Sequence, residues 1–214
     1  MSSKTPGGLF VVSAPSGGGK TSLTRGAIDA LAKVGIEAEI SVSYTTRAPR
    51  PGEKNGTHYH FIDRPAFEAM VERGEFLEHA VIYGHCYGTA RARTEQRLAS
   101  GRDVILDIDW QGARQIRQHM PGSTGIYLLP PSMAQLEQRL RARRQDTEEA
   151  IRQRLSLARQ EMAHYEYYDY VIVNKDFEQA MSEFVAIFVA RRLSRSVQEI
   201  KHNSLIHKLI GKPD

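Results

Sequence analysis

The stretch "SAPSGGGKTS", residues 13–22, directly follows the apolar run Leu9–Val12. Its glycines carry no side chains, so the backbone N–H groups of this stretch can converge on one point. A helix that begins just beyond the glycines would add the positive end of its dipole to the same point. A concave set of donors of this kind suits an anion, and above all a phosphate group.

This stretch matches the phosphate-binding pattern G-x-x-x-x-G-K-[ST], with alanine in the first glycine position. The pattern requires a strand before it and a helix after it. The sequence predicts a buried strand over residues 9–13 and a helix over residues 20–34, closed by Gly35. Lys20 would reach the β- and γ-phosphates of a nucleotide, and the Thr21 hydroxyl would hold Mg²⁺. Ala14 fits the loop if its φ is negative. The alternative is a glycine-rich surface turn. The predicted phosphate-binding residues are Ala14, Pro15, Ser16, Gly17, Gly18, Gly19, Lys20 and Thr21.

The overall composition is that of an ordinary globular protein. The 214 residues are 41% hydrophobic and 25% charged, which fits one domain of generous size. No apolar run approaches the length of about 18 residues that a membrane span needs, and residues 1–8 lack the apolar core of a secretory signal. The single cysteine, Cys86, cannot form an internal disulfide, so we expect a cytoplasmic protein. The net charge of +4 permits either a nucleotide or a nucleic acid as partner.

Short apolar runs alternate with helical segments along the chain. After residues 9–13, such runs cover residues 104–109, 126–129 and 170–173. Near-continuous apolar strands between helices indicate a parallel sheet with helices on both faces, so the predicted fold class is α/β. The expected buried faces are Leu23, Ala27, Leu31 and Val34 on the first helix, and Phe184, Ile187 and Phe188 on a last helix from Phe177 to about Ile200.

Two segments interrupt this alternation. Residues 41–91 are rich in Thr, Tyr, His, Gly and Pro around one short predicted helix, Pro65–Arg73, and we expect a small β-rich insertion there. Residues 132–159 are helical and strongly basic. Capping-box spacing predicts two helices in this second segment, with a break near Gln145; the capping pairs are Ser132 with Gln135 and Asp146 with Glu149.

Arg47 and Arg50 lie three residues apart, among prolines, and are followed by Tyr59 on a predicted strand. Guanidinium groups offer forked donors, and a tyrosine adds a hydroxyl, so this set could bind a second anion. A charged surface loop is the alternative.

Asp107 and Asp109 end a predicted apolar strand, and the period of two points both side chains the same way. Carboxylates at the end of a buried strand near a phosphate loop commonly serve Mg²⁺ and its waters. The alternative is that they cap the following helix.

Several blocks of the chain, taken together, resemble the guanylate kinases in their bacterial form. The first is T-T-R-x-x-R-x-x-E-x-x-G-x-x-Y-x-F over residues 45–61. The others follow in family order: "FLEHA" (76–80), "YGTARA" (87–92), "ILDIDWQGA" (105–113), "PPS" (130–132) and "VIVN" (171–174). The likeness runs from about Leu9 to the last helix and so covers nearly the whole chain.

The resemblance implies a P-loop core with a parallel sheet, a small β-rich GMP-binding insertion and a helical lid. The core would comprise residues 1–40, 92–131 and 160–214, the GMP-binding region residues 41–91, and the lid residues 132–159. The implied activity is transfer of a phosphoryl group from ATP to GMP, giving ADP and GDP, with Mg²⁺ as cofactor. The transfer would be in line, and no residue would act as nucleophile. The implied catalytic cations are Lys20, Arg47, Arg50, Arg143 and Arg154.

The resemblance also assigns substrate contacts. Arg47, Arg50, Tyr59 and Tyr87 match the family's contacts to the GMP phosphate, and Ser43, Glu78, Thr89 and Asp109 match its guanine contacts. A carboxylate suits guanine, because N1–H and the exocyclic amine of guanine donate side by side. From the residues alone, Glu78 could instead be a solvated helix-end charge and Thr89 a turn hydroxyl. Asp107 matches the metal-side role together with Thr21.

Arg143 and Arg154 match the two lid arginines that fold over the nucleotides, and Asn174 matches a residue near adenine. Arg144 stands where glycine is common in the family. The basic run could instead be a solvated helix face. A second interpretation of the chain is a catalytically inactive guanylate kinase-like module that binds proteins.

Other interpretations are weaker. His58 and His60 alternate along a predicted strand, but no third ligand lies nearby in the sequence, so we do not expect a metal site there. Cys86 has no motif for a nucleophile and is predicted to fill space. We expect no nucleic acid and no membrane as partner. The sequence leaves a monomer and a homo-oligomer open.

Overall fold

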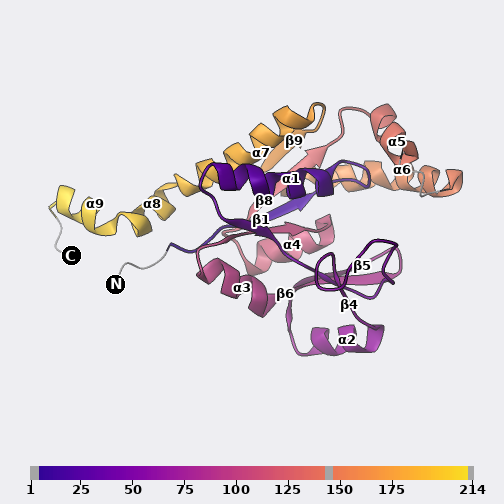
Figure 1. Ribbon diagram of the computed structural model, residues 1–214, viewed down its shortest axis with the longest axis horizontal. Coiled ribbons are helices and arrows are strands. Elements are labelled where there is room, and N and C mark those ends of the chain that lie inside the picture. The colour runs from indigo at the N-terminus through magenta and orange to yellow at the C-terminus, as the bar shows by residue number, and fades with distance from the viewer. Residues whose placement is uncertain (1–4, 143–146, 212–214) are drawn as a thin grey trace.

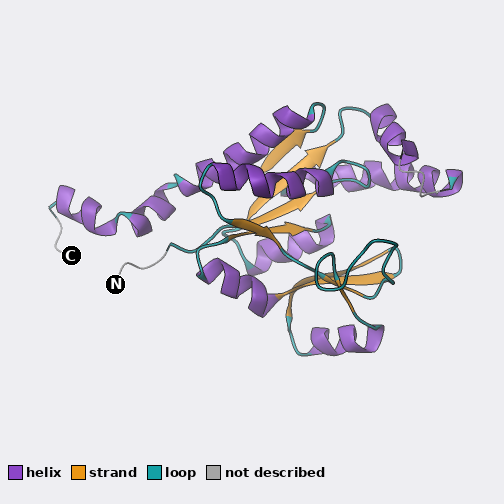
Figure 2. Cartoon of the chain, in the orientation of Figure 1, coloured by secondary structure: helices purple, strands orange, loops and turns teal. Residues whose placement is uncertain are grey.

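The computed structural model describes residues 5–142 and 147–211. Its centre is a five-stranded parallel sheet in the order β2-β7-β1-β8-β9, with helices packed on both faces (Figures 1 and 2). The predicted α/β class and parallel sheet are therefore confirmed. The strands are β1 (Leu9–Ser13), β2 (Ala38–Ile40), β7 (Asp103–Asp107), β8 (Thr124–Leu129) and β9 (Tyr170–Val173). Of these, only the short edge strand β2 was not predicted.

Strand β1 shows why this sheet forms. All five of its residues are buried, and the side chains of the first four alternate between two separate apolar clusters. Phe10 and Val12 face the cluster built with α1 (Lys20–Lys33) and α7 (Phe177–Arg192), where the Phe10 ring stacks on Phe188 with centroids 3.6 Å apart. The opposite face packs against α3 (Arg91–Ala99) and α4 (Trp110–His119). Burial on both faces is the condition under which a parallel sheet is stable.

Helix α1 begins at Lys20 as predicted and ends one residue early. Leu23, Ala27 and Leu31 are fully buried. Val34 is 53% exposed, so its predicted place on the buried face is wrong. It is the C-cap residue, and Gly35 with φ of 75° turns the chain away, so that Ile36 enters the core instead.

The β-rich insertion is confirmed as a separate four-stranded sheet in the order β4-β3-β6-β5, below the main sheet in Figure 1. Its strands are β3 (Tyr44–Thr45), β4 (His60–Phe61), β5 (Phe76–Ile82) and β6 (His85–Ala90), and α2 (Arg64–Glu72) covers it. Its small core holds Phe67, Phe76 and Cys86, so Cys86 fills space as predicted. Tyr83 and Gly84, with φ of 49° and 80°, form the tight turn between β5 and β6.

The basic segment forms two helices, as predicted: α5 (Met133–Ala142) and α6 (Glu148–Ala163), followed by a 3₁₀ turn at His164–Tyr167. They pack through a cluster of their own, which includes Leu140 and Ile151. The Ser132 hydroxyl accepts the Gln135 N–H at 3.1 Å, as predicted. The predicted Asp146 cap is wrong, because α6 starts one residue later and Thr147 Oγ1 accepts the Ala150 N–H. Asp146 lies outside the described residues.

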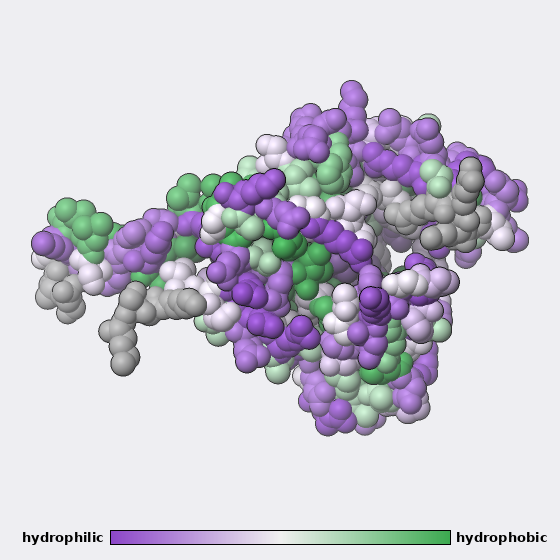
Figure 3. All heavy atoms as spheres, viewed as in Figure 1, coloured by the Kyte–Doolittle hydropathy of each residue, from purple (hydrophilic) through white to green (hydrophobic). Residues whose placement is uncertain are grey.

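The C-terminal helix is shorter than predicted. It ends at Arg192, and two short helices, α8 (Arg195–Lys201) and α9 (Asn203–Leu209), follow it away from the core (Figure 1). The predicted core face of Phe184, Ile187 and Phe188 is buried. Beyond Arg192 the chain has no sheet to cover, and Figure 3 shows apolar side chains on the surface of these last helices. No helix in residues 5–142 and 147–211 is long and apolar enough to span a membrane.

Candidate active site

The loop between β1 and α1 is shaped by its glycines. Gly17 and Gly19 have φ of 90° and 94°, a region that other residues rarely adopt. A Cβ atom on Gly19 would also lie 2.3 Å from Asn174 Nδ2. Apart from glycines, Tyr83 is the only one of the described residues with a positive φ. Ala14 therefore has a negative φ, as its place in the loop requires. No described side chain caps the start of α1, which leaves its first N–H groups available to an anion.

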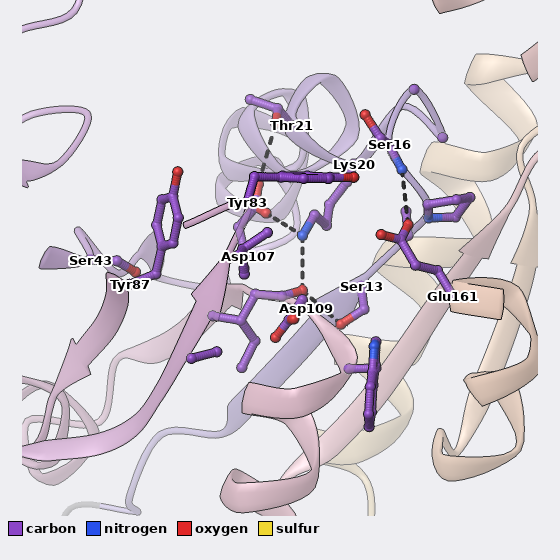
Figure 4. Close-up of a pocket in the computed structure, with 18 of the residues that line it drawn as sticks. Ser13, Ser16, Lys20, Thr21, Ser43, Tyr83, Tyr87, Asp107, Asp109 and Glu161 are labelled. Carbon is purple, nitrogen blue, oxygen red and sulfur yellow. Dashed lines mark hydrogen bonds and ion pairs between the residues drawn. The ribbon is translucent and has the colours of Figure 1, made fainter. Parts of the chain in front are cut away.

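Lys20 is held at the bottom of this loop by two acceptors. Its Nζ lies 2.7 Å from Asp107 Oδ1 and donates to the Ile108 carbonyl oxygen at 2.8 Å (Figure 4). Thr21 Oγ1 donates to Asp107 Oδ2 at 3.4 Å. The sequence separates these residues widely, and the parallel pairing of β1 with β7 brings them together.

The hydroxyl of Thr21 and the carboxylate of Asp107 are hard oxygen ligands of the kind that Mg²⁺ prefers. Nucleotide-bound Mg²⁺ needs only one or two protein ligands, because phosphates and waters supply the rest. The described residues hold no cluster of three or more His, Cys, Asp or Glu side chains suited to a metal. The pair therefore fits a nucleotide-bound Mg²⁺ rather than an all-protein site.

Asp109 behaves differently from Asp107. Strand β7 ends at Asp107, and Asp109 is the N-cap of α4, where its Oδ1 accepts the Gly112 N–H at 3.0 Å. Its Oδ2 accepts a 2.9 Å bond from Gln111 Nε2. The helix-cap alternative considered from the sequence thus holds for Asp109, although the residue also lines the cavity beside the phosphate loop.

Glu78 and Thr89 form a buried polar pair on facing positions of β5 and β6. Glu78 is 2% exposed, and its Oε1 accepts a 2.6 Å bond from Thr89 Oγ1. Burial raises the pKa of Glu78 to about 7; the Thr89 bond lowers it and the nearby Asp109 charge adds to the rise. A solvated helix-end charge is thereby excluded for Glu78. Gly112 leaves room for the carboxylate, because a Cβ there would lie 2.4 Å from Oε2.

The two predicted anion-binding arginines lie in different environments. The Arg47 guanidinium is mostly buried, sits 5.5 Å from the centre of the Tyr59 ring, and is bound by both oxygens of Glu53. Arg50 is exposed. Burial raises the pKa of Tyr59 to about 12, with Asp107 adding to the rise, so its hydroxyl remains a neutral donor at neutral pH. The Tyr59 and Tyr87 rings meet edge to face at 5.9 Å.

Two cavities adjoin in this region. One of about 300 Å³ reaches from the phosphate loop to Glu78 and includes Asp109, Ser43 and Arg154. The other, of about 310 Å³, includes Arg47. Both are lined by Thr21, Arg50, Tyr59, Tyr87 and Asp107. The main sheet, the small sheet and α6 thus face one continuous cleft.

The remaining predicted residues are placed unevenly. Arg154 lines the first cavity from α6, whereas Arg143 lies outside the described residues. Thr89 is buried behind Glu78 and lines neither cavity. Asn174 is buried after β9, and its Nδ2 donates to the Gly18 carbonyl oxygen at 3.0 Å. Its side chain therefore supports the phosphate loop in this structure.

Four residues of this region were not predicted from the sequence. Glu53 lies inside the quoted 45–61 block but had no role assigned. Glu161 lines the cavity from α6, and its Oε2 accepts the Ser16 N–H at 3.4 Å; burial raises its pKa. It follows Arg154 by seven residues, a helical spacing that could have signalled a shared face. Arg139 donates to the Asn174 carbonyl oxygen at 2.8 Å, and Tyr83 lines the cavity from its turn.

Comparison with known proteins identifies the family. The model of the guanylate kinase family matches residues 7–191. The chain belongs to the guanylate kinase family. It is 52% identical over 207 residues to a guanylate kinase of Salmonella choleraesuis, covering 96% of this chain and 98% of that protein. It is also 52% identical over 204 residues to a guanylate kinase of Coxiella burnetii, covering 95% and 97%.

A solved structure agrees with this result. The crystal structure of guanylate kinase from Anaplasma phagocytophilum superposes with a TM-score of 0.78 at 32% identity, covering 99% of each chain. The resemblance inferred from the sequence blocks is thus confirmed, as is the predicted class of enzyme, a nucleoside monophosphate kinase. These comparisons give no support to the inactive binding module.

Proposed function

We propose that this member of the guanylate kinase family carries out its transfer of the γ-phosphoryl group of ATP to the phosphate of GMP in the cleft described above. Family membership and 52% identity over nearly the full length carry the ATP:GMP phosphotransferase activity. The structural observation that supports it best is the continuous cleft between the phosphate loop and the Glu78–Thr89 pair. We also propose the division into a core (1–40, 92–131, 160–214), a GMP-binding region (41–91) and a lid (132–159). Helix α6 crosses the boundary between lid and core.

On the ATP side, the loop from Ala14 to Thr21 cradles the phosphates through its backbone N–H groups. Lys20 neutralises charge on the transferring phosphoryl group, and its contacts to Asp107 and Ile108 hold it in place before substrate arrives. Thr21 and Asp107 would hold Mg²⁺, partly through water, and the ion would neutralise negative charge on the phosphates. Asn174 remains proposed as an ATP-side residue, supported by its position behind Gly18.

On the GMP side, ionised Glu78 accepts from N1–H and the exocyclic amine of guanine, while Thr89, Ser43 and Asp109 complete the base pocket. Arg47 and Arg50 bind the GMP phosphate, and the hydroxyls of Tyr59 and Tyr87 donate to it without adding charge. The proposal is supported by the cleft, because all of these residues except Thr89 line the two adjoining cavities, one of which also includes the phosphate loop. Positioning of this kind converts a reaction of two repelling anions into an in-line transfer within one complex.

No protein nucleophile is needed, because an oxygen of the GMP phosphate attacks the γ-phosphorus in line. Lys20, Arg47, Arg50, Arg143 and Arg154 are the proposed catalytic cations, which stabilise charge on the phosphoryl oxygens as the lid closes and excludes water. The position of Arg154 on the cavity wall supports its share in this role. We further propose a cytoplasmic location, supported by the single free and buried Cys86.

A coupled assay of ADP release tests the assignment, with GMP, dGMP, AMP, UMP and CMP as acceptors. AMP offers an acceptor at N1 where GMP offers a donor, so it would face Glu78 lone pair to lone pair. A site built on buried polar pairing rejects such an analogue by about 10⁴–10⁵ in kcat/KM. If AMP serves as well as GMP, the guanine pocket is wrongly assigned.

A further inference from the structure

The carboxylate of Glu53 contacts both arginines of the proposed GMP-phosphate site. Each of its oxygens lies 2.9 Å from Arg47 Nη2, and Oε2 also accepts a 2.7 Å bond from the backbone N–H of Arg50. The side chains of Arg47 and Glu53 are only 11% and 17% exposed. Charge-assisted bonds with this geometry and burial are stronger than an ordinary surface ion pair.

Further contacts also hold the guanidinium of Arg47 in one orientation. Its Nη1 donates to the Ala48 carbonyl oxygen at 2.7 Å, and its backbone N–H donates to Thr45 Oγ1 at 3.2 Å. Its guanidinium lies above the Tyr59 ring. These contacts fix the plane of the guanidinium without using all five of its N–H donors. By contrast, no described residue forms a hydrogen bond or ion pair with the exposed guanidinium of Arg50.

The charges of Arg47, Arg50 and Glu53 also affect how the empty site holds together. Two guanidinium groups in one small site repel each other until an anion is bound, and Glu53 offsets one of the two charges. Burial works to raise the pKa of Glu53, but the bonds from Arg47 and Arg50 outweigh it and hold that pKa below its usual range. Glu53 is therefore ionised at neutral pH.

We propose that Glu53 is a positioning residue for the acceptor phosphate: it holds Arg47 ready to bind GMP and keeps the two-arginine site together when it is empty. The inference rests on the proposed function, since it concerns the GMP-phosphate site of that assignment. Glu53 does not touch the substrate in this role. It acts by removing the freedom that Arg47 would otherwise lose on binding.

The first test is Glu53→Gln, which keeps the shape and one oxygen but loses the charge and the second acceptor for Arg47. We expect the KM for GMP to rise about tenfold, with a change of less than about threefold in kcat and in the KM for ATP. Glu53→Asp, which retains the charge, should recover part of the loss. The matched control is Glu68→Gln on α2, which removes the same charge from an exposed pair with Arg64. It should not alter the KM for GMP.

Calorimetry with GMP and with guanosine separates positioning from a general structural role. Glu53→Gln should weaken GMP binding and leave guanosine binding as in the unmodified protein, because guanosine has no phosphate. In an Arg47→Ala background, Glu53→Gln should add little further loss, since Glu53 acts through Arg47. Equal losses for both ligands, or fully additive losses in the double variant, would overturn the inference.

The same measurements distinguish this inference from the proposed function. If the unmodified protein binds GMP no more tightly than guanosine, the phosphate site of the proposed function is wrong. If it prefers GMP strongly and Glu53→Gln retains the whole preference, only the role of Glu53 is wrong.

Discussion

The phosphate loop and the small sheet are built to bind their proposed phosphates in opposite ways. The loop uses backbone N–H groups of consecutive residues, and it sits between the fully buried β1 and the start of α1. The small sheet uses side chains that its strand pairing gathers from residues 43–89, although β3 and β4 have only two residues each. A backbone site depends on local conformation, whereas a side-chain site depends on many mutual contacts.

This difference has an energetic consequence. The loop gains its shape from the conformations of its glycines and from the large core beside it. Its charged residue, Lys20, therefore contributes little to folding. In the small sheet, by contrast, several of the polar groups are buried or largely buried and bind one another. Glu53 with Arg47 and Glu78 with Thr89 are examples. We therefore expect substitution of Lys20 in the loop to affect mainly catalysis, and substitutions of the buried polar groups in the small sheet to affect both binding and stability.

The largest expected effect belongs to the loop. Lys20→Ala should lower kcat by about 10³-fold, because a preorganised cation facing the developing charge is lost. The fold should persist, since the Lys20 side chain packs in no apolar cluster. Steady-state kinetics and circular dichroism check both points, with Lys33→Ala in the last turn of α1 as control. Nearly full activity in a folded Lys20→Ala protein would show that the loop does not bind the transferring phosphate.

A smaller effect with two opposing parts is expected for Glu78→Gln in the small sheet. The kcat/KM for GMP should fall by about 10²-fold, because an amide N–H would face the guanine donors. Stability should move the other way. The folded pKa of Glu78, about 7, lies above its usual value of 4.5. The folded state thus retains a proton that the unfolded chain releases, and the free energy of unfolding falls as the pH rises through this window.

The Glu78→Gln variant lacks this pH-dependent loss. Without GMP, its Tm at pH 8 should exceed that of the unmodified protein by roughly 2–6 °C, and the difference should shrink toward pH 4.5. Guanosine binding to the unmodified protein should weaken as the pH falls below about 7, and guanosine avoids the titration of the GMP phosphate. A Tm difference that does not depend on pH would contradict a buried carboxyl group with a raised pKa at this position.

The same contrast explains what the sequence could predict. Strand β1, the loop and α1 are contiguous and follow local rules, so their places could be predicted closely. The role of Lys20 stays a prediction. The parallel sheet followed from apolar runs that are buried on both faces. The small sheet could be predicted only as β-rich, and its strands β3 and β4, with two residues each, are too short to leave a periodic signal. The residues themselves suggested Arg47, Arg50 and Tyr59 as an anion site. The other proposed site residues of this sheet, Ser43, Glu78, Tyr87 and Thr89, came from the family resemblance.

The prediction was poorest where a side chain has two possible partners. The side chains of Asp107 and Asp109 were expected to point the same way. The strand ends at Asp107, however, and the carboxylate of Asp109 caps α4. Glu161 reaches the Ser16 N–H of the loop from α6, and Arg139 reaches the Asn174 carbonyl oxygen from α5. Only the packing of those helices on the sheet brings these groups together. Contacts of this kind depend on tertiary distances that a sequence does not contain.

The smallest expected effect tests whether the backbone cradle owes its shape only to its own residues. Asn174 supports the loop from β9 through its bond to the Gly18 carbonyl oxygen, and it was also predicted to lie near adenine. Asn174→Ala removes one buried hydrogen bond, so the KM for ATP should rise by about three- to tenfold. If the residue acts on the loop, the KM for GTP as phosphoryl donor should rise by the same factor, because the triphosphates are alike. If it contacts the base, the loss should be confined to ATP.

Asn203→Ala, on the exposed α9, is the control for the substitution itself. Equal losses for ATP and GTP would mean that even a site made of consecutive residues draws part of its shape from a distant strand. A loss for ATP alone would mean that Asn174 contacts adenine and that the glycines of the loop suffice for its shape.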